Sequence, residues 1–174
     1  MIRMALHKAG VDFEDRRLTG PEFGAMKKEG KFDFNQVPML QLADGTQLVQ
    51  SVPIFNYLGN VYKLKPEDPM VCYVAAKCVA LAVGDFYQGQ WLKNAFGPAD
   101  KREEAMKKVS EEGFPTMLEG LEKSLPDTKL LCGNTSTIYD FQLAGIFVST
   151  ILNSPRTAGY ENAGPKTKAY VAAF

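Results

Sequence analysis

Apolar residues in the first third of the chain follow both helical and strand-like periods. In residues 2–9 they recur every three or four positions, which predicts an amphipathic helix, with Gly10 as its C-terminal cap. Residues 11–18 alternate between apolar and polar side chains and predict a strand. Residues 21–28 have a weak pattern, typical of a short helix or an irregular loop.

A hairpin signal follows in residues 39–50, where the runs MLQLA and TQLVQ flank Asp44-Gly45. An Asp-Gly pair supplies the positive φ angles of a tight type I′ turn, so we predict a β-hairpin. A second amphipathic helix then begins at Ser51. Its predicted apolar face consists of Ile54, Tyr57, Leu58 and Val61.

Beyond residues 62–70, where charges and two prolines interrupt the periodicity, nearly all of the chain has a helical pattern. Long helices are predicted over residues 71–92 and 99–124, the second broken or bent around Gly113 and Pro115.

A last buried helix is predicted to begin at Thr137, which forms a capping box with Asp140. Residues 138–152 are apolar on almost every side and predict the centre of a helical bundle. Residues 165–174 indicate one more helix. The pattern therefore predicts a small mixed sheet with flanking helices, joined to an all-α bundle. One strand and one hairpin make a thin sheet, which suggests that a strand is missing.

Composition excludes several classes of function. The 174 residues are 45% hydrophobic and 23% charged, as in ordinary globular proteins, and the formal net charge is zero. Nothing therefore indicates a nucleic-acid partner or an anionic membrane surface. No apolar run reaches the length of a membrane span, and the N-terminus lacks a signal-peptide core. His7 is the only histidine, which disfavours a histidine-based metal site or nucleophile.

The three cysteines, Cys72, Cys78 and Cys132, have no Cys-x-x-Cys spacing. This disfavours a disulfide reductase and a metal site. We interpret them as buried structural thiols in a reducing, cytoplasmic setting.

Four stretches together resemble the cytosolic glutathione S-transferases, in particular the sigma-like group: ALHKAGVDFED, GKFDFNQVPML, DGTQLVQSVPIFNYL and NTSTIYDFQLA. The order and spacing of Val37-Pro38, Asp44-Gly45, Gln50-Ser51 and Tyr57-Leu58 carry the resemblance. It implies an α/β thioredoxin-like N-terminal domain lacking its first strand, followed by an all-α helical bundle domain. The expected domains are a glutathione-binding domain at 1–62, a linker at 63–69 and the helical domain at 70–174, paired as a homodimer.

The resemblance implies that one end of glutathione lies on the hairpin. In the family the proline of the Val-Pro step is cis, and the backbone of Val37 beside Pro38 is expected to pair with glutathione as a strand would. Ser51, at a helix start, is expected to hold the γ-glutamyl carboxylate, and Gln50 to accept from its ammonium group. Taken alone, Ser51 also fits a plain helix cap.

The other end of glutathione needs cations or donors. By position the family's aromatic and lysine correspond to Phe23 and Lys27, with Gln36 adjoining the turn and Lys31 as an alternative cation. The family aromatic is usually tryptophan, and Phe23 cannot donate its hydrogen bond. Asp85 resembles an acid that family members extend across the dimer to the glutamyl ammonium group, and equally fits a surface aspartate.

The chemistry of the family depends on the glutathione thiolate. In sigma-like members a tyrosine hydroxyl at the end of the first strand donates a hydrogen bond to the sulfur, which lowers the pKa of the thiol. No residue of this chain matches that position, so no catalytic residue is assigned, and Arg3 is interpreted as structural. The implied activity is conjugation or isomerisation of small apolar electrophiles, with glutathione as co-substrate and no metal or other cofactor.

Tyr87, Trp91 and Phe96 are candidates for a second pocket, although we favour core packing as their role. Two explanations fit the missing tyrosine. The chain is a fragment of an active transferase, which we favour, or it is a non-catalytic module of the same fold that binds partner proteins.

Overall fold

The structure, a computed structural model, describes residues 1–148 and 160–174. It divides the chain into two compact units, Ile2–Lys65 and Pro66–Phe174, the second of which also includes Met1. The division falls within the segment 63–69, which the sequence marks by charge and proline.

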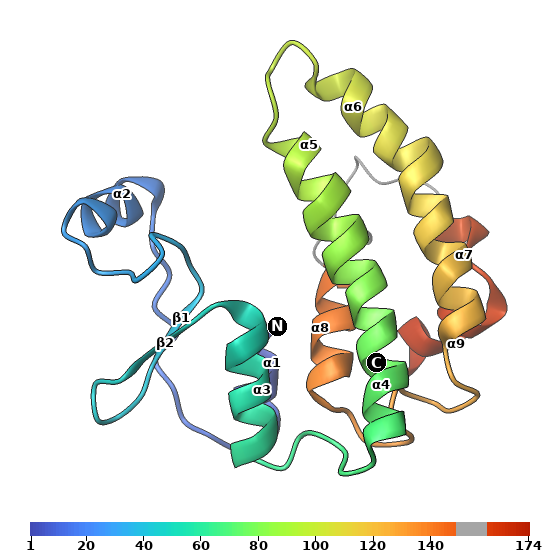
Figure 1. Cartoon of the computed structure of the whole chain (residues 1–174), viewed down its shortest axis with the longest axis horizontal. Coiled ribbons are helices and arrows are strands. Elements are labelled where there is room, and N and C mark those ends of the chain that lie inside the picture. Colours follow the sequence, from blue (N-terminus) through green and yellow to red (C-terminus); the bar gives the residue numbers. More distant parts are fainter. Residues whose placement is uncertain (149–159) are drawn as a thin grey trace. The chain divides into compact units, whose positions relative to one another are not determined.

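The first unit consists of helices around one β-hairpin (Figure 1). Its elements are α1 (Ile2–Lys8), α2 (Gly20–Lys28), β1 (Met39–Gln41), β2 (Gln47–Val49) and α3 (Ser51–Val61). Helices α1 and α3 pack together and supply most of its buried apolar side chains. These are Ala5, Leu6, Ile54, Phe55 and Leu58. The predicted helix at 2–9 is confirmed, and Gly10 ends it with φ +67°.

The predicted strand at 11–18 is wrong, because this segment pairs with no strand in the described part of the chain. A strand requires a neighbouring backbone, and the sheet of the described residues consists of β1 and β2. Ion pairs hold the segment instead. Arg3 Nη1 lies 3.0 and 3.1 Å from the two carboxylate oxygens of Asp15, and Arg17 Nε lies 2.9 Å from one of them.

The hairpin is confirmed, but its turn differs from the predicted type. Strands β1 and β2 are antiparallel, with Met39 opposite Val49 and Gln41 opposite Gln47. Only Gly45 within the turn has a positive φ, +88°, whereas a type I′ turn requires two such residues. The amide of Leu42 donates to the carbonyl of Thr46 at 2.8 Å, which closes a three-residue loop. Asp44 has no positive φ, and its carboxylate accepts from the Thr46 amide at 2.9 Å, as in an Asx turn.

Two helices of this unit refine the sequence interpretation. Residues 21–28 lie in helix α2, whose start is fixed by a capping box between Thr19 and Glu22. Helix α3 buries Phe55 in place of the predicted Val61, which is 51% exposed. The apolar face of α3 is therefore rotated from the predicted one, since Phe55 follows directly on Ile54.

The second unit begins with a continuous helix from Pro69 to Ala95. It comprises α4 (Pro69–Val79), the π-helical segment η1 (Ala80–Leu92) and α5 (Lys93–Ala95). Asp68 caps it by accepting from the amides of Met70 and Val71 at 2.7 and 3.2 Å.

By length and composition alone this helix would suffice to cross a membrane, with a mean hydropathy of 1.5 in a window that is 22% buried. The sequence analysis did not identify residues 69–95 as a possible membrane span, because polar and charged residues divide the segment into short apolar runs. The helix contacts α7 and α8, as a helix of a globular bundle does.

The next helical stretch is also continuous, so the predicted break does not occur. It consists of α6 (Arg102–Lys108), the π-helical η2 (Val109–Gly113) and α7 (Phe114–Ser124). Pro115 lies in the first turn of α7, where its missing N–H is tolerated. The change of hydrogen-bonding pattern at η2 therefore replaces the predicted break at Gly113 and Pro115.

The centre of the bundle is helix α8 (Ile138–Ile146), in which every residue is buried. This confirms the predicted central helix; its predicted end, 149–152, lies outside the described residues. Asp140 accepts from the Thr137 amide and hydroxyl, both at 2.8 Å, and from the Leu131 amide at 2.9 Å. The predicted Thr137–Asp140 capping box is thus confirmed.

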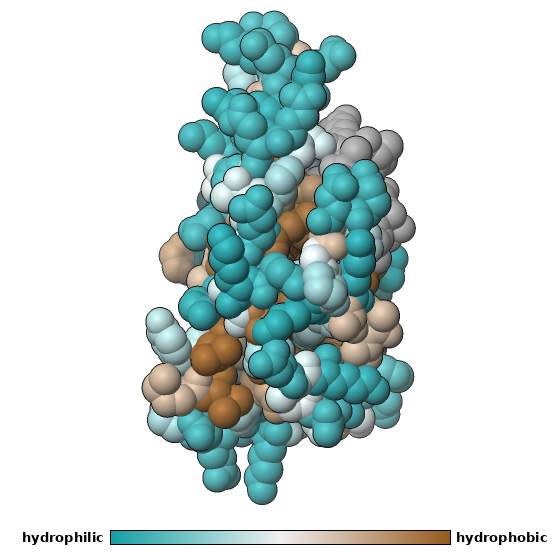
Figure 2. Space-filling model, turned by 90° about the vertical axis from the view of Figure 1, so that its right-hand side faces the viewer, coloured by the Kyte–Doolittle hydropathy of each residue, from teal (hydrophilic) through white to brown (hydrophobic). Residues whose placement is uncertain are grey.

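The described chain ends with η4 (Tyr160–Asn162) and α9 (Pro165–Ala173). Tyr170 of α9 donates its hydroxyl to the Asp140 carboxylate at 3.2 Å. On the face of the helical unit shown in Figure 2, hydrophilic side chains predominate, and hydrophobic ones form a narrow band and a cluster near the lower end.

Candidate functional site

The turn before β1 presents backbone to solvent. The Val37–Pro38 peptide bond is cis, and Asn35, two residues before Val37, has φ +53°. The Val37 residue is 53% exposed. The ladder begins only at Met39, so the amide and carbonyl of Val37 have no backbone partner within the described residues. This edge can therefore accept an extended peptide.

Gln50 and Ser51 lie beside this turn, because β2 runs antiparallel to β1 and ends opposite it. Gln50 has φ +68°, and its Nε2 donates to Oε1 of Gln36 at 3.1 Å. Ser51 is the first residue of α3, and Gln50, not Ser51, holds the capping position. Within the described residues the Ser51 hydroxyl makes no hydrogen bond, so the plain-cap interpretation of Ser51 is wrong. The positive end of the α3 dipole and a free hydroxyl lie together.

Phe23 and Lys27 form a separate group on α2. The Lys27 ammonium lies 5.2 Å from the centroid of the Phe23 ring, a cation–π contact. The Phe23 ring also packs against Phe32, with centroids 5.4 Å apart. Phe32 is buried and links this group to the segment before the turn. Sequence reasoning missed Phe32, although an aromatic residue between charged ones was the available signal. Lys31, the alternative cation, is exposed beyond the end of α2.

Asp85 belongs to the other unit. It lies on η1 with an exposed side chain and makes no hydrogen bond or ion pair within the described residues. The structure thus brings together Gln36, Val37, Pro38, Gln50 and Ser51, pairs Phe23 with Lys27, and leaves Asp85 on the helical unit.

Comparisons with known proteins identify the family. A glutathione S-transferase of Gallus gallus is 33% identical over 149 residues, which are 82% of this chain and 64% of that protein. The solved glutathione S-transferase of Ascaris lumbricoides matches 98% of this chain and 82% of its own, with 25% identity and a TM-score of 0.73. The chain belongs to the glutathione S-transferase family. No family model matches it.

The fold follows from the same comparisons. The sigma-class glutathione S-transferase of Fasciola hepatica superposes with a TM-score of 0.78 over 98% of this chain and 81% of its own, at 23% identity. The thioredoxin-like N-terminal domain followed by a helical domain is therefore confirmed as the fold. The chain spans less than two thirds of the length of the curated relatives it matches.

The three aromatic residues considered for a second pocket, Tyr87, Trp91 and Phe96, differ in their packing and exposure. Tyr87 and Trp91 stack with ring centroids 5.6 Å apart, and the buried indole N–H of Trp91 has no hydrogen-bond partner among the described residues. Phe96 is 78% exposed, so the core-packing interpretation is wrong for this residue.

The cysteines of this glutathione S-transferase chain are free thiols, as predicted. Burial raises the pKa of the Cys78 thiol. Burial also raises the pKa of Cys132 to about 11, opposed by a hydrogen bond from Thr137 and aided by the nearby Asp140 charge. Within the described residues no group of three metal-binding side chains is found. Cys78 and Cys132 are therefore poor nucleophiles. The predicted burial is confirmed for Cys78, whereas Cys72 and Cys132 are only half-buried.

Proposed function

We propose that this chain binds glutathione along the Val37 edge and acts as part of a glutathione transferase on small apolar electrophiles. The observation that carries the proposal is the Gln50–Gln36 hydrogen bond. It fixes the unengaged Ser51 hydroxyl and the start of α3 next to the exposed backbone of Val37. A peptide ligand can use all three groups: the Ser51 hydroxyl, the amides at the start of α3 and the backbone of Val37.

The γ-glutamyl end of glutathione lies at the start of α3 in this proposal. Its carboxylate accepts from the Ser51 hydroxyl and from amides of the first helical turn, where the helix dipole favours an anion. Its ammonium group donates to the side-chain Oε1 of Gln50, which makes no hydrogen bond within the described residues, whereas the backbone carbonyl of Gln50 already accepts from the Ile54 amide. The backbone of Val37, before Pro38, pairs with the cysteinyl peptide group.

The glycyl carboxylate of glutathione pairs with the Lys27 ammonium, and Gln36 closes the site beside the turn. Lys27 lies over the Phe23 ring, which holds the ammonium in place without donating a hydrogen bond itself. Asp85 of a second subunit would approach the glutamyl ammonium group from the opposite side.

The chemistry follows from the ligand. The sulfur lone pair of the glutathione thiolate forms a bond to an electrophilic carbon, and the leaving group departs with the bonding electrons. Binding contributes to the rate by holding the thiolate next to the electrophile, which makes a bimolecular step effectively unimolecular. This chain contributes the binding groups, and we assign none of its residues to deprotonation of the thiol.

The functional form is a homodimer in this proposal, located in the cytoplasm. Large apolar side chains are exposed on both units: Phe34 is 61%, Met70 64% and Tyr73 60% exposed. Burying such residues against a second copy would remove apolar surface from water. Phe34→Ser should therefore shift sedimentation of the chain towards the monomer.

The test of the proposal is a titration of the chain with glutathione, followed through the amide NMR signals of Val37 and Ser51. We expect saturable shifts at both positions. Cysteinylglycine, which lacks the γ-glutamyl group, should bind at least about tenfold more weakly, because the contacts at Gln50 and Ser51 are lost. Equal affinity for the two peptides, or shifts that spare both residues, would overturn the assignment.

A further inference from the structure

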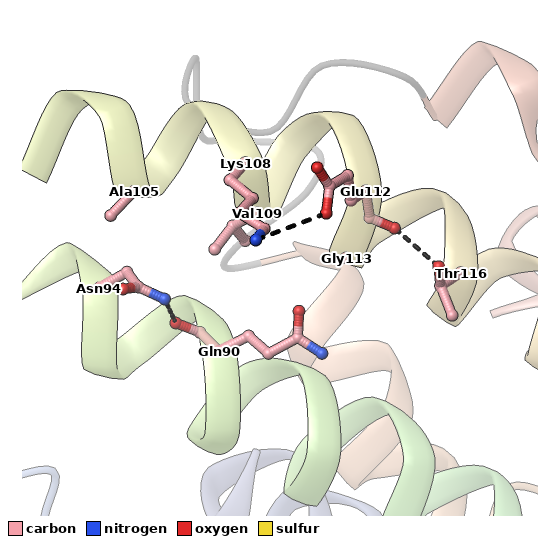
Figure 3. A pocket seen from close by; sticks show the side chains of 8 residues that line it. All are labelled: Gln90, Asn94, Ala105, Lys108, Val109, Glu112, Gly113 and Thr116. Carbon is pink, nitrogen blue, oxygen red and sulfur yellow. Dashed lines mark hydrogen bonds and ion pairs between the residues drawn. The ribbon is translucent and has the colours of Figure 1, made fainter.

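A pocket of about 380 Å³ lies within the helical unit, and none of the residues that line it is assigned to glutathione (Figure 3). Its walls come from η1 and α5 on one side and from α6, η2 and α7 on the other. This volume falls at the lower end of the range for small-molecule sites. Five of its eight lining residues have polar side chains, although more of the lining surface is apolar than polar, so a ligand would meet both apolar stems and polar groups.

One wall presents an unengaged carboxamide. Figure 3 shows the side chain of Gln90 extending from its helix towards Gly113 on the facing helix. A Cβ atom at position 113 would collide with Oε1 of Gln90, so the glycine makes room for this side chain. The backbone carbonyl of Gln90 accepts from Asn94 Nδ2 at 2.7 Å. The carboxamide itself has no partner within the described residues and keeps its donor and acceptor for a ligand.

The other wall carries two opposite charges. The Lys108 ammonium lies 3.9 Å from the Glu112 carboxylate, which is longer than a hydrogen bond. Their side chains are 74% and 69% exposed. Both groups therefore remain able to bind a ligand, and their charges together attract neither a pure anion nor a pure cation.

We propose that this pocket binds a short zwitterionic peptide of about dipeptide size. Its carboxylate pairs with Lys108, its ammonium group pairs with Glu112, and its peptide group matches the donor and acceptor of Gln90. Two extended residues span about 7 Å, so the two ends can reach both members of a pair 3.9 Å apart. The proposal does not depend on glutathione binding at the Val37 edge.

The chain contains a matched control for the charged wall. Lys107 and Glu111 form an ion pair with the same spacing and the same 3.9 Å separation, with side chains 71% and 64% exposed. Neither residue lines the pocket. If surface charge acts only in a general way, substitutions in either pair should change ligand binding equally. If the ligand contacts the pocket wall, only substitutions of Lys108 and Glu112 should weaken binding.

The experiment is a titration of the full chain with glycylglycine, followed through the amide NMR signals of Gln90 and Gly113. We expect saturation at millimolar concentration, and no saturation with the uncharged N-acetylglycinamide. Lys108→Met and Glu112→Gln should each weaken binding about threefold to fivefold, while Lys107→Met and Glu111→Gln should leave it unchanged. Thermal melting of all four variants establishes that each is folded.

Three results would overturn the proposal. One is the absence of saturable shifts at both positions in the unaltered chain. Another is an equal loss of binding in the Lys107 and Glu111 variants. The third is binding of acetate or methylammonium alone as tightly as glycylglycine, which would indicate a site for single charges.

Discussion

The starts of two helices, α3 and α8, differ in how their polar groups are used. At α8, the carboxylate of Asp140 accepts four hydrogen bonds from Thr137, Leu131 and Tyr170, and every group is buried. At α3, Ser51 makes no side-chain hydrogen bond within the described residues, and the neighbouring residue Val37 is exposed and has no backbone partner among them. The first arrangement stabilises the fold, and the second leaves donors for a ligand. A helix start is therefore a candidate binding site only if its polar groups lack internal partners.

The largest effect should come from removing the acceptor at α8. Asp140→Ala leaves the buried donors of Thr137, Leu131 and Tyr170 without partners, which should lower the free energy of unfolding by about 3 kcal/mol or more. The melting temperature should fall by about 6–12 °C. Asp68→Ala is the matched control, since it removes an exposed cap and should cost about 1 kcal/mol. Equal losses in urea denaturation of the two variants would contradict the comparison.

The next effect concerns the thiol beside α8. A helix start often lowers a thiol pKa, but the pKa of Cys132 is raised to about 11, first by burial and further by the Asp140 charge. Its thiolate fraction at pH 7.5 should be more than about 100-fold below that of a free cysteine. Alkylation of Cys132 by iodoacetamide, followed by mass spectrometry, should accelerate about tenfold per pH unit up to about pH 10. Alkylation of the folded chain at the rate of the urea-unfolded chain would contradict this.

A smaller effect tests the start of α3. Ser51→Asp adds an acidic residue to the first turn, where the helix dipole favours it, so the melting temperature should be maintained. The new carboxylate should repel that of glutathione and weaken binding more than tenfold, or about 1.4 kcal/mol. Ser51→Ala is the control, with loss of one hydrogen bond and no repulsion. If the aspartate variant binds glutathione as tightly as the serine chain in calorimetry, Ser51 takes no part in the site.

The smallest effect concerns the ion pairs of Asp15. Hydrogen bonds from Arg3 and then from Arg17 lower the pKa of the Asp15 carboxyl below its usual value of 3.8. A lowered folded-state pKa contributes stability above the unfolded-state pKa, and this contribution is lost as pH falls through the lower, folded value. Thermal melts of Arg3→Met between about pH 2 and 5 should therefore fall less steeply than those of the unaltered chain. Parallel curves would show that Arg3 does not hold this carboxylate.

The sequence predicted elements whose signals are local. Thr137 and Asp140 lie three residues apart and identify a helix start without knowledge of the rest of the fold. The hairpin was equally clear from Asp44-Gly45. Features that depend on distant partners were not predictable. The alternation in residues 11–18 suggests a strand, but whether a strand forms depends on a neighbouring backbone.

The candidate site divides in the same way. Ser51 was recognised at a helix start, but only the positive φ of Gln50 and its contact with Gln36 show that Ser51 is not the cap. The pairing of Lys27 with Phe23, and the support of Phe23 by Phe32, follow from side-chain directions that no spacing rule provides. The pocket near Gln90 was not predicted, because its walls belong to two different helices whose packing no sequence pattern specifies.

The three-residue hairpin loop also offers a place for chemical labelling. The strands β1 and β2 separate this loop from the Val37 and Ser51 end by about four residues, or about 13 Å. Ala43 is exposed there, whereas Gly45 must keep its left-handed backbone. A fluorophore on Ala43→Cys would therefore be attached to the rigid hairpin while leaving the opposite end unobstructed. A chain labelled or immobilised through this position should report on ligands at the Val37 edge without blocking them.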